Sequence, residues 1–238
     1  MKLTLKNIGK IGTASVEING ITVIAGENNT GKSTVGKALY CLFTAFHNIN
    51  DKIVEERSLS IYRAISAPFR KRRANILMAP NGLRRIAEEI CKNRTRYFYT
   101  SAKYDAPIAL SNISTGFKTF LILKTLLMNG AIEEGGTIIL DEPEIHLHPE
   151  WQLVFAELIV LIHKEFGIHV LLNTHSPYFL NAIEVYAVKH GIDDKCKYYL
   201  ASSNAEVSNI EDVTNNIEAI YSKLARPLQD LENERGQL

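Results

Sequence analysis

A glycine-rich segment carries the clearest chemistry in this sequence. It matches the pattern G-x-x-x-x-G-K-[ST] at every fixed position and consists of Gly26, Glu27, Asn28, Asn29, Thr30, Gly31, Lys32, Ser33 and Thr34. An apolar run suited to a strand precedes it, and a helical spacing of apolar residues follows it. Strand, glycine-rich loop and helix in this order predict a loop whose backbone N–H groups bind a polyphosphate. Lys32 would then reach the β- and γ-phosphates, and the Ser33 hydroxyl would bind Mg²⁺.

Two carboxylates and a histidine follow two further apolar runs. Asp141 and Glu142 come directly after residues 137–140, and His175 comes shortly after residues 168–173. An aspartate at such a point can hold Mg²⁺ opposite Ser33, and the next glutamate can orient or deprotonate an attacking water. His175 is a candidate to contact the γ-phosphate or to position that water. The alternatives are an ordinary turn at the end of the strand for the two carboxylates and a structural role for the histidine.

The elements that must position these residues alternate between strand and helix. This order predicts an α/β fold with a mostly parallel sheet that has helices on both faces. Because functional groups gather at the carboxyl ends of parallel strands, Lys32, Asp141, Glu142 and His175 should meet at one edge. Alternating residues 3–18 predict N-terminal antiparallel strands, and Asn19-Gly20 predicts a hairpin leading into the next strand. We also expect strands at 185–188 and 198–201, and helices at 34–48, 114–129, 149–165 and 214–226, with the last dozen residues frayed.

Length and composition indicate one globular domain, residues 1–238, in which residues 49–110 form a small basic helical lobe. The net charge of +1 gives no general argument for nucleic acid, but ten basic residues face only two acids between Arg63 and Arg96. That basic region is either a DNA or RNA contact or a solvated helix face. The three cysteines are far apart without a C-x-x-C pair, which indicates reduced thiols and no zinc site. With no signal peptide and no membrane span expected, we predict a cytoplasmic protein without membrane contact.

Four segments together resemble a known group of ATPases. GENNTGKST, ISTGFKTF, TIILDEPEIHLHPEWQ and LLNTHSPYFL make the chain similar to ABC-type ATPase heads of the RecF/SMC/OLD (overcoming lysogenization defect) group, also described as AAA-type ATP-binding proteins. The resemblance covers residues 1–50 and about 110–185. It implies a P-loop NTPase fold, ATP and Mg²⁺ as ligands, and a homodimer that encloses two ATP molecules. In such a dimer the signature residues Ser114, Thr115 and Gly116 complete the partner's site, residues 144–148 cross the interface, and His175 contacts the γ-phosphate.

The departures from this group bear on function. The signature reads S-T-G-F-K rather than S-G-G-Q, no glutamine lies between the two phosphate-site motifs, and no nuclease region follows. The resemblance implies an ATPase that drives or gates a separate partner, either a nuclease or toxin subunit or DNA, in bacterial anti-phage (antiviral) defence or DNA repair. The alternative is a slow or inactive ATP-gated scaffold that holds a partner protein. A transporter ATPase is less favoured because of the signature and the H-L-H-P stretch, and a GTPase because N-K-x-D is absent.

Overall fold

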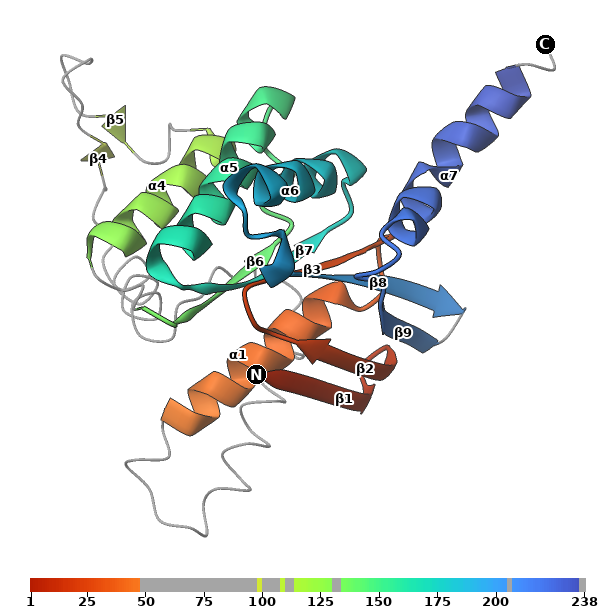
Figure 1. Ribbon diagram of the computed structural model, residues 1–238, viewed down its shortest axis with the longest axis horizontal. Coiled ribbons are helices and arrows are strands. Elements are labelled where there is room, and N and C mark those ends of the chain that lie inside the picture. Colours follow the sequence, from red (N-terminus) through yellow and green to blue (C-terminus); the bar gives the residue numbers. More distant parts are fainter. Residues whose placement is uncertain (48–97, 100–107, 110–113, 130–133, 205–206, 236–238) are drawn as a thin grey trace, which may run out of the picture.

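Apolar residues on both faces characterise the central strands of this protein, because helices cover the sheet from both sides (Figure 1). The computed structural model describes residues 1–47, 98–99, 108–109, 114–129, 134–204 and 207–235. Within them a seven-stranded sheet has the order β1-β2-β9-β8-β3-β7-β6. Its strands are β1 (Lys2–Ile8), β2 (Ile11–Glu17), β3 (Ile21–Gly26), β6 (Thr137–Asp141), β7 (His169–Thr174), β8 (Cys196–Asn204) and β9 (Val207–Asp212).

The sheet is mostly parallel, as predicted. β3 pairs in parallel with β7 and β8, β6 with β7, and β2 with β9, whereas β1-β2 and β8-β9 are antiparallel. The predicted hairpin at Asn19-Gly20 is wrong. β2 and β3 are consecutive in sequence but do not pair, since β3 takes its partners from strands much later in the chain. Gly20 has a φ of 90° and lies so close to Lys195 that a Cβ would be 2.1 Å from its carbonyl oxygen.

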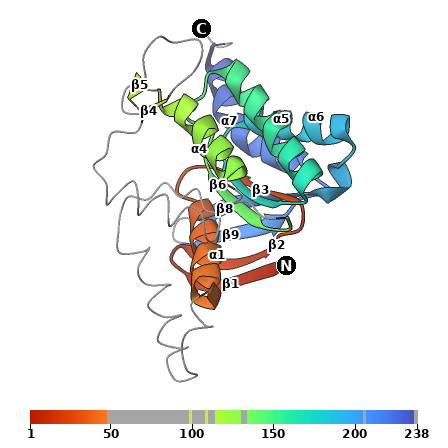
Figure 2. The ribbon, with the colours of Figure 1, turned by 90° about the vertical axis from the view of Figure 1, so that its left-hand side faces the viewer.

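The sheet separates two hydrophobic cores. On one face α1 (Lys32–His47) packs Val35, Ala38 and Leu39 against strand residues such as Ile139. On the other face lie α4 (Thr115–Met128), α5 (Pro149–Phe166) and α6 (Pro177–His190), as two views at right angles show (Figures 1 and 2). Alternate residues of each strand face opposite cores, so both layers hold the strand ends in place.

The ends of the helices follow the expected capping chemistry. α5 begins at Pro149 and ends before Gly167, which has a φ of 62°. In α6, Ser176 accepts a hydrogen bond from Phe179 N (3.2 Å), and Gly191 (φ 67°) follows the last turn. The strand predicted at 185–188 is therefore wrong, because these residues belong to α6. The strand at 198–201 is confirmed within β8.

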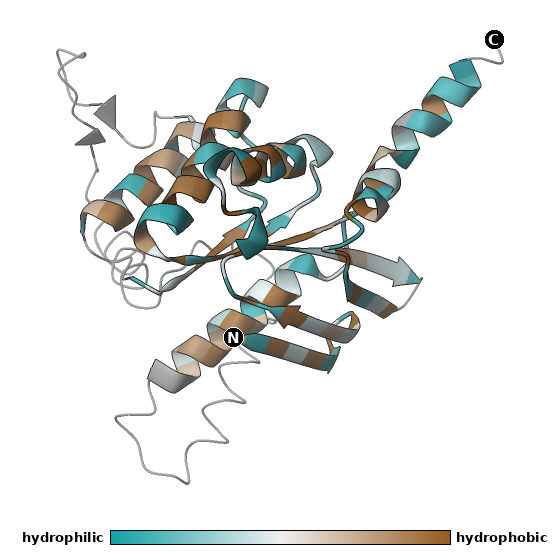
Figure 3. Ribbon diagram, viewed as in Figure 1, coloured by the Kyte–Doolittle hydropathy of each residue, from teal (hydrophilic) through white to brown (hydrophobic). Residues whose placement is uncertain are grey.

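The last helix, α7 (Glu218–Arg235), begins later and ends later than predicted, and residues expected to be frayed are helical. It is the most hydrophilic of the described helices (Figure 3). A short 3₁₀ helix, η4 (Asp193–Lys195), precedes β8. The strands β4 (Phe98–Tyr99) and β5 (Ile108–Ala109) form a separate antiparallel pair. The rest of the predicted basic lobe lies outside the described residues. No helix of the described part of the chain is long and apolar enough to cross a membrane.

Candidate functional site

The glycine-rich loop connects β3 to α1, in the predicted context. Asn29 has a φ of 65° and Gly31 a φ of 85°, so the loop curls into a conformation that favours glycine and asparagine. A hydrogen bond within the loop also stabilises this conformation, because Thr30 Oγ1 donates to Glu27 O (2.8 Å). The first turn of α1 carries no acidic residue. The positive end of the helix dipole therefore faces the loop without a neutralising carboxylate, which suits an anion.

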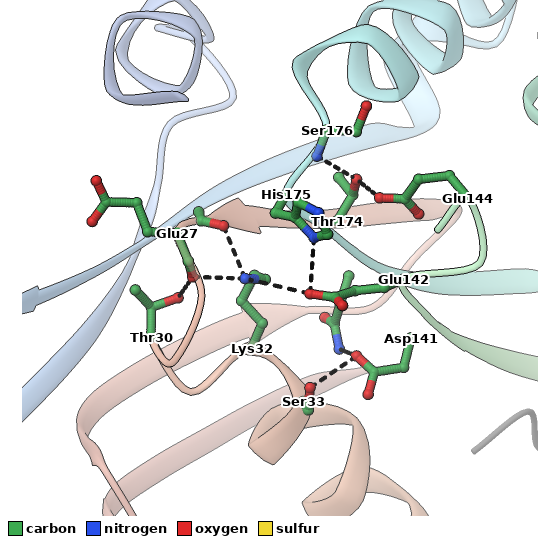
Figure 4. A network of polar contacts seen from close by, with 12 residues as sticks. Glu27, Thr30, Lys32, Ser33, Asp141, Glu142, Glu144, Thr174, His175 and Ser176 are labelled. Carbon is green, nitrogen blue, oxygen red and sulfur yellow. Dashed lines mark hydrogen bonds and ion pairs between the residues drawn. The ribbon is translucent and has the colours of Figure 1, made fainter. Parts of the chain in front are cut away.

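Lys32 is buried beside this loop, with only 4% of its surface exposed. Its Nζ donates to the carbonyl oxygens of Gly26 (2.8 Å) and Glu27 (2.7 Å), and it lies 3.9 Å from Glu142 Oε1 (Figure 4). Burial lowers the pKa of Lys32, while nearby carboxylates, led by Glu142, oppose that shift. A polyanion at the loop would add to the groups that stabilise the charged ammonium.

Ser33 and Asp141 lie close together across the sheet edge, as the sequence predicted for an Mg²⁺ pair. Ser33 Oγ donates to Asp141 Oδ1 (3.0 Å), and Asn173 Nδ2 donates to the same oxygen (3.0 Å). Both of these bonds use Oδ1, so neither occupies Oδ2. A hydroxyl and a carboxylate supply the hard oxygen ligands that Mg²⁺ prefers, one or two of them being usual where phosphates complete the coordination. The donor set therefore fits this ion.

Glu142 directly follows β6 in an uncommon backbone conformation, with a φ of 48°. Its backbone N–H donates to Asn173 O (2.9 Å), which holds that conformation. Such a residue costs about 1–3 kcal/mol in strain and is typical of active sites. Glu142 Oε1 is 3.1 Å from His175 Nδ1, an ion-pair distance whose angle does not meet hydrogen-bond geometry. The carboxylate thus lies between the Lys32 ammonium and the His175 ring (Figure 4).

A second carboxylate of this segment, Glu144, turns inward and is only 2% exposed. Thr174 Oγ1 donates a short hydrogen bond to Glu144 Oε1, and Thr174 Oγ1 in turn accepts from Ser176 N (3.0 Å). Burial raises the pKa of Glu144, and the Thr174 hydrogen bond only partly offsets this. The loop after β6 is therefore tied to the loop after β7 by a buried link.

The predicted signature residues are at the start of α4. Ser114 Oγ caps this helix by accepting from Phe117 N (3.4 Å), and Ser114 and Thr115 are exposed. Gly116 is buried, and a Cβ there would lie 2.6 Å from His146 O. Within the described part of the chain, no hydrogen bond or ion pair joins these three residues to the glycine-rich loop.

The structure thus brings together Lys32, Ser33, Asp141, Glu142 and His175, whereas no hydrogen bond or ion pair of the described residues joins Ser114, Thr115 or Gly116 to them. Their roles in binding and catalysis stay predictions. Sequence reasoning missed Asn173 and the Thr174–Glu144 pair. The available signal was the change from an apolar strand to Asn-Thr just before the histidine, although only the histidine was given a role.

Comparison with known proteins adds a family and a fold. The family described as "AAA domain, putative AbiEii toxin, Type IV TA system" matches residues 63–181, half of the chain. This match contains Asp141 and Glu142 together with His175, and it begins after the glycine-rich loop. A retron Vc95 probable ATPase of Vibrio cholerae is 28% identical over 137 residues, which are 52% of this chain and 26% of that protein. The chain therefore spans about a quarter of that relative's length.

Two kinds of protein extend the comparison. The cytochrome c biogenesis ATP-binding export protein CcmA of Reclinomonas americana is 28% identical over 174 residues, 68% of this chain and 75% of that protein. An SMC head domain from Thermotoga maritima (16% identity, TM-score 0.50, 89% of this chain and 98% of that one) shares the fold. So does an SMC head bound to the C-terminal winged-helix domain of ScpA (12%, TM-score 0.54, 89% and 96%). The chain belongs to the family described as "AAA domain, putative AbiEii toxin, Type IV TA system", an AAA-type P-loop ATPase domain.

Proposed function

We propose that this protein binds ATP with Mg²⁺ and hydrolyses it to ADP and phosphate. One observation carries the proposal: the residues of three separate motifs converge at the carboxyl ends of β3, β6 and β7 (Figure 4). A loop for the triphosphate, an oxygen pair for the metal, and a carboxylate beside a histidine are the parts that phosphoryl transfer to water requires.

Each residue has a distinct task in this proposal. The loop N–H groups and Lys32 bind the β- and γ-phosphates, for which Lys32 exchanges its bonds to the Gly26 and Glu27 carbonyls. Ser33 and Asp141 hold Mg²⁺, which neutralises charge on the phosphate oxygens when it is bound. Glu142 orients the attacking water and accepts its proton, and its Oε1 lies 3.9 Å from Lys32 Nζ and 3.1 Å from His175 Nδ1.

The proposal includes a dimer. The start of α4 lacks an acidic residue in its first turn and presents the exposed Ser114 and Thr115, so it suits an anion. Because no hydrogen bond or ion pair among the described residues joins it to the glycine-rich loop of its own chain, we assign it to the ATP bound by a second copy. Nucleotide would then hold two heads together, with Ser114, Thr115 and Gly116 of each completing the other's site, and hydrolysis would release them.

The partner that such a dimer drives or gates is proposed by analogy. The likeness to a retron ATPase and to a family named for a toxin supports a role with a separate nuclease or toxin subunit in anti-phage defence. An SMC head with a bound ScpA domain gives a precedent for protein partners on this fold. DNA maintenance through the basic region between Arg63 and Arg96 is a further proposal, and the whole of that region lies outside the described residues. A slow scaffold is the second candidate, favoured by the lack of a glutamine between the motifs.

Two substitutions test the ATPase. Lys32→Ala should abolish ATP binding measured by fluorescence of an ATP analogue. Glu142→Gln should bind ATP with near wild-type affinity and lose about 10²–10⁴-fold in single-turnover rate, the usual contribution of a general base. Glu165→Gln, at the exposed end of α5, is the matched control and should match wild type. Retention of wild-type turnover by Glu142→Gln would show that another group serves the water.

The same Glu142→Gln protein tests the dimer. Light scattering with Mg-ATP should give twice the monomer mass, and without nucleotide the monomer mass. Adding a DNA duplex then tests the basic region, which predicts DNA in the dimer peak. A mass that ATP does not change would refute the nucleotide-dependent dimer. If the wild-type protein formed the dimer with Mg-ATP but hydrolysed ATP very slowly, the scaffold would be favoured.

A further inference from the structure

Asn173 is a polar residue in the most buried part of the sheet. It lies near the end of β7, has no exposed surface, and follows Val170, Leu171 and Leu172, which are buried and apolar. Burying an amide in such surroundings is unfavourable unless its hydrogen bonds are made. An apolar residue would fit the pattern of this strand, so the contacts of the amide must account for its presence.

Those contacts reach the two acidic residues that follow β6. In the parallel register Asn173 is the direct neighbour of Asp141, which brings the two side chains to the same face of the sheet. Asn173 Nδ2 donates to Asp141 Oδ1 (3.0 Å). Its backbone carbonyl accepts from the N–H of Glu142 (2.9 Å), the residue with the uncommon backbone conformation. Asn173 therefore holds two consecutive residues in place, Asp141 through its side chain and Glu142 through its backbone carbonyl.

The other end of the Asn173 amide makes no bond. Its Oδ1 is buried without a hydrogen-bond partner among the described residues. Turning the amide over would place oxygen against the Asp141 carboxylate, so the bond to Asp141 decides its orientation. Gly36 of α1 faces this side chain, since a Cβ at Gly36 would lie 3.7 Å from Asn173 Nδ2. The orientation of the amide that makes the bond to Asp141 therefore leaves its oxygen unpaired.

We propose that Asn173 is a positioning residue for the divalent cation: its amide locks the Asp141 carboxylate so that Oδ2 points toward the metal. The proposal rests on the proposed binding of Mg-ATP. Asp141 Oδ1 accepts from Ser33 and Asn173 together, and Ser33 must move its oxygen to the metal when nucleotide binds. Asn173 is then the donor that remains on Oδ1, and without it the carboxylate can rotate. Hydrogen-bond partners of this kind orient metal ligands and increase the affinity for the metal.

A purely structural role for Asn173 makes a different prediction. Asn173→Leu has the same branched arrangement of side-chain heavy atoms, and it removes both the bond to Asp141 and the unpaired oxygen. If Asn173 only stabilised the fold, this variant would lower the melting temperature and leave the metal dependence of the folded protein unchanged. If it positions Asp141, the variant keeps its melting temperature in EDTA and needs more Mg²⁺. Asn173→Ser, smaller and polar, is a second variant that cannot overpack the site.

The test is a titration of each protein with a fluorescent ATP analogue, first in EDTA and then with increasing MgCl₂. We expect nucleotide affinity in EDTA to equal wild type in both variants, and the half-saturating Mg²⁺ concentration to rise about tenfold. Thr22→Val is the matched control. It removes a buried hydroxyl bonded to Glu17 O at the opposite end of the neighbouring strand β3, and it should leave the Mg²⁺ titration unchanged.

The outcomes separate the inference from the function on which it rests. An unchanged Mg²⁺ half-saturation in both folded Asn173 variants overturns the positioning role and leaves the ATPase proposal standing. A loss of nucleotide affinity already in EDTA also overturns it, since Asn173 would then support the phosphate loop rather than the metal. Wild-type protein that binds nucleotide equally with EDTA and MgCl₂, or does not bind it, refutes the metal site itself and the inference with it.

Discussion

Gly116 is constrained by a contact within its own chain, and Gly116→Ala tests that constraint. Gly116 lies in the first turn of α4 against the loop between β6 and α5. A Cβ there would be 2.6 Å from His146 O and 3.0 Å from Leu147 Cδ2. The closer of these atoms is backbone, so the methyl group cannot be accommodated by turning a side chain. Either α4 or the loop must move.

The size of the effect follows from two opposing contributions. Overpacking of this kind typically costs about 1–3 kcal/mol. Alanine favours a helix over glycine by up to about 1 kcal/mol, and less in the first turn. The net expectation is a loss of about 1–2 kcal/mol in the free energy of unfolding. For a chain of this size that corresponds to a fall of about 2–8 °C in melting temperature.

The assay is thermal unfolding followed by circular dichroism, with Gly36→Ala as the matched control. A Cβ at Gly36 would be 3.0 Å from Ile139 Cγ2, a side-chain atom that can shift by a few tenths of an ångström. Gly36 lies inside α1, where alanine gains its full helix preference. Gly36→Ala should therefore remain close to wild type. If Gly116→Ala melts at or above Gly36→Ala, the close approach of α4 to His146 does not constrain the fold.

Two further predictions concern buried titratable groups. Burial raises the pKa of Glu144 in the folded protein. The protonated side chain therefore contributes to the free energy of unfolding below the ordinary glutamate pKa of about 4.3, and this contribution is lost as the pH rises through the folded pKa. Glu144→Gln stays neutral, so its melting temperature minus that of wild type should grow from pH 4 to pH 8, and a constant difference would contradict this. Burial also raises the pKa of Cys41 to about 11 and of Cys196 to about 12. Both should resist iodoacetamide at about pH 8 until the protein is unfolded, as mass spectrometry of the labelled peptides would show, and labelling of the native protein would refute their burial.

The sequence allowed most of the sheet and helices to be predicted, because local signals mark their ends. Pro149 and Gly167 bound α5 where the sequence placed them, and β6 ends at the predicted carboxylates. The error at residues 185–188 shows the limit of composition. Two valines and a tyrosine favour a strand, but the buried positions of α6 recur at helical spacing, and Ser176 and Gly191 cap both ends.

Long-range pairing was the part that local signals could not give. Asn19-Gly20 is a hairpin sequence, yet β3 pairs with β7 and β8, where Ile21 is opposite Val170 and Cys196, far along the chain. The same limit applies to the site. The motifs identified Lys32, Asp141 and His175 one by one, since each follows its own strand. The contact of Asn173 with Asp141 depends on β6 and β7 being neighbours in a particular register, which no single motif encodes.

That register gives the end of β7 its importance. Three consecutive residues there each contact a different carboxylate of the segment after β6: Asn173 contacts Asp141, Thr174 contacts Glu144, and His175 contacts Glu142. Asn173 and Thr174 point to opposite faces of the sheet, so one strand end holds Asp141, the proposed metal ligand, on one side and the buried Glu144 on the other. A small shift of β7 against β6 would alter all three contacts together. The proposed metal ligand Asp141, the proposed base Glu142 and the buried Glu144 are therefore coupled through a single pair of strands.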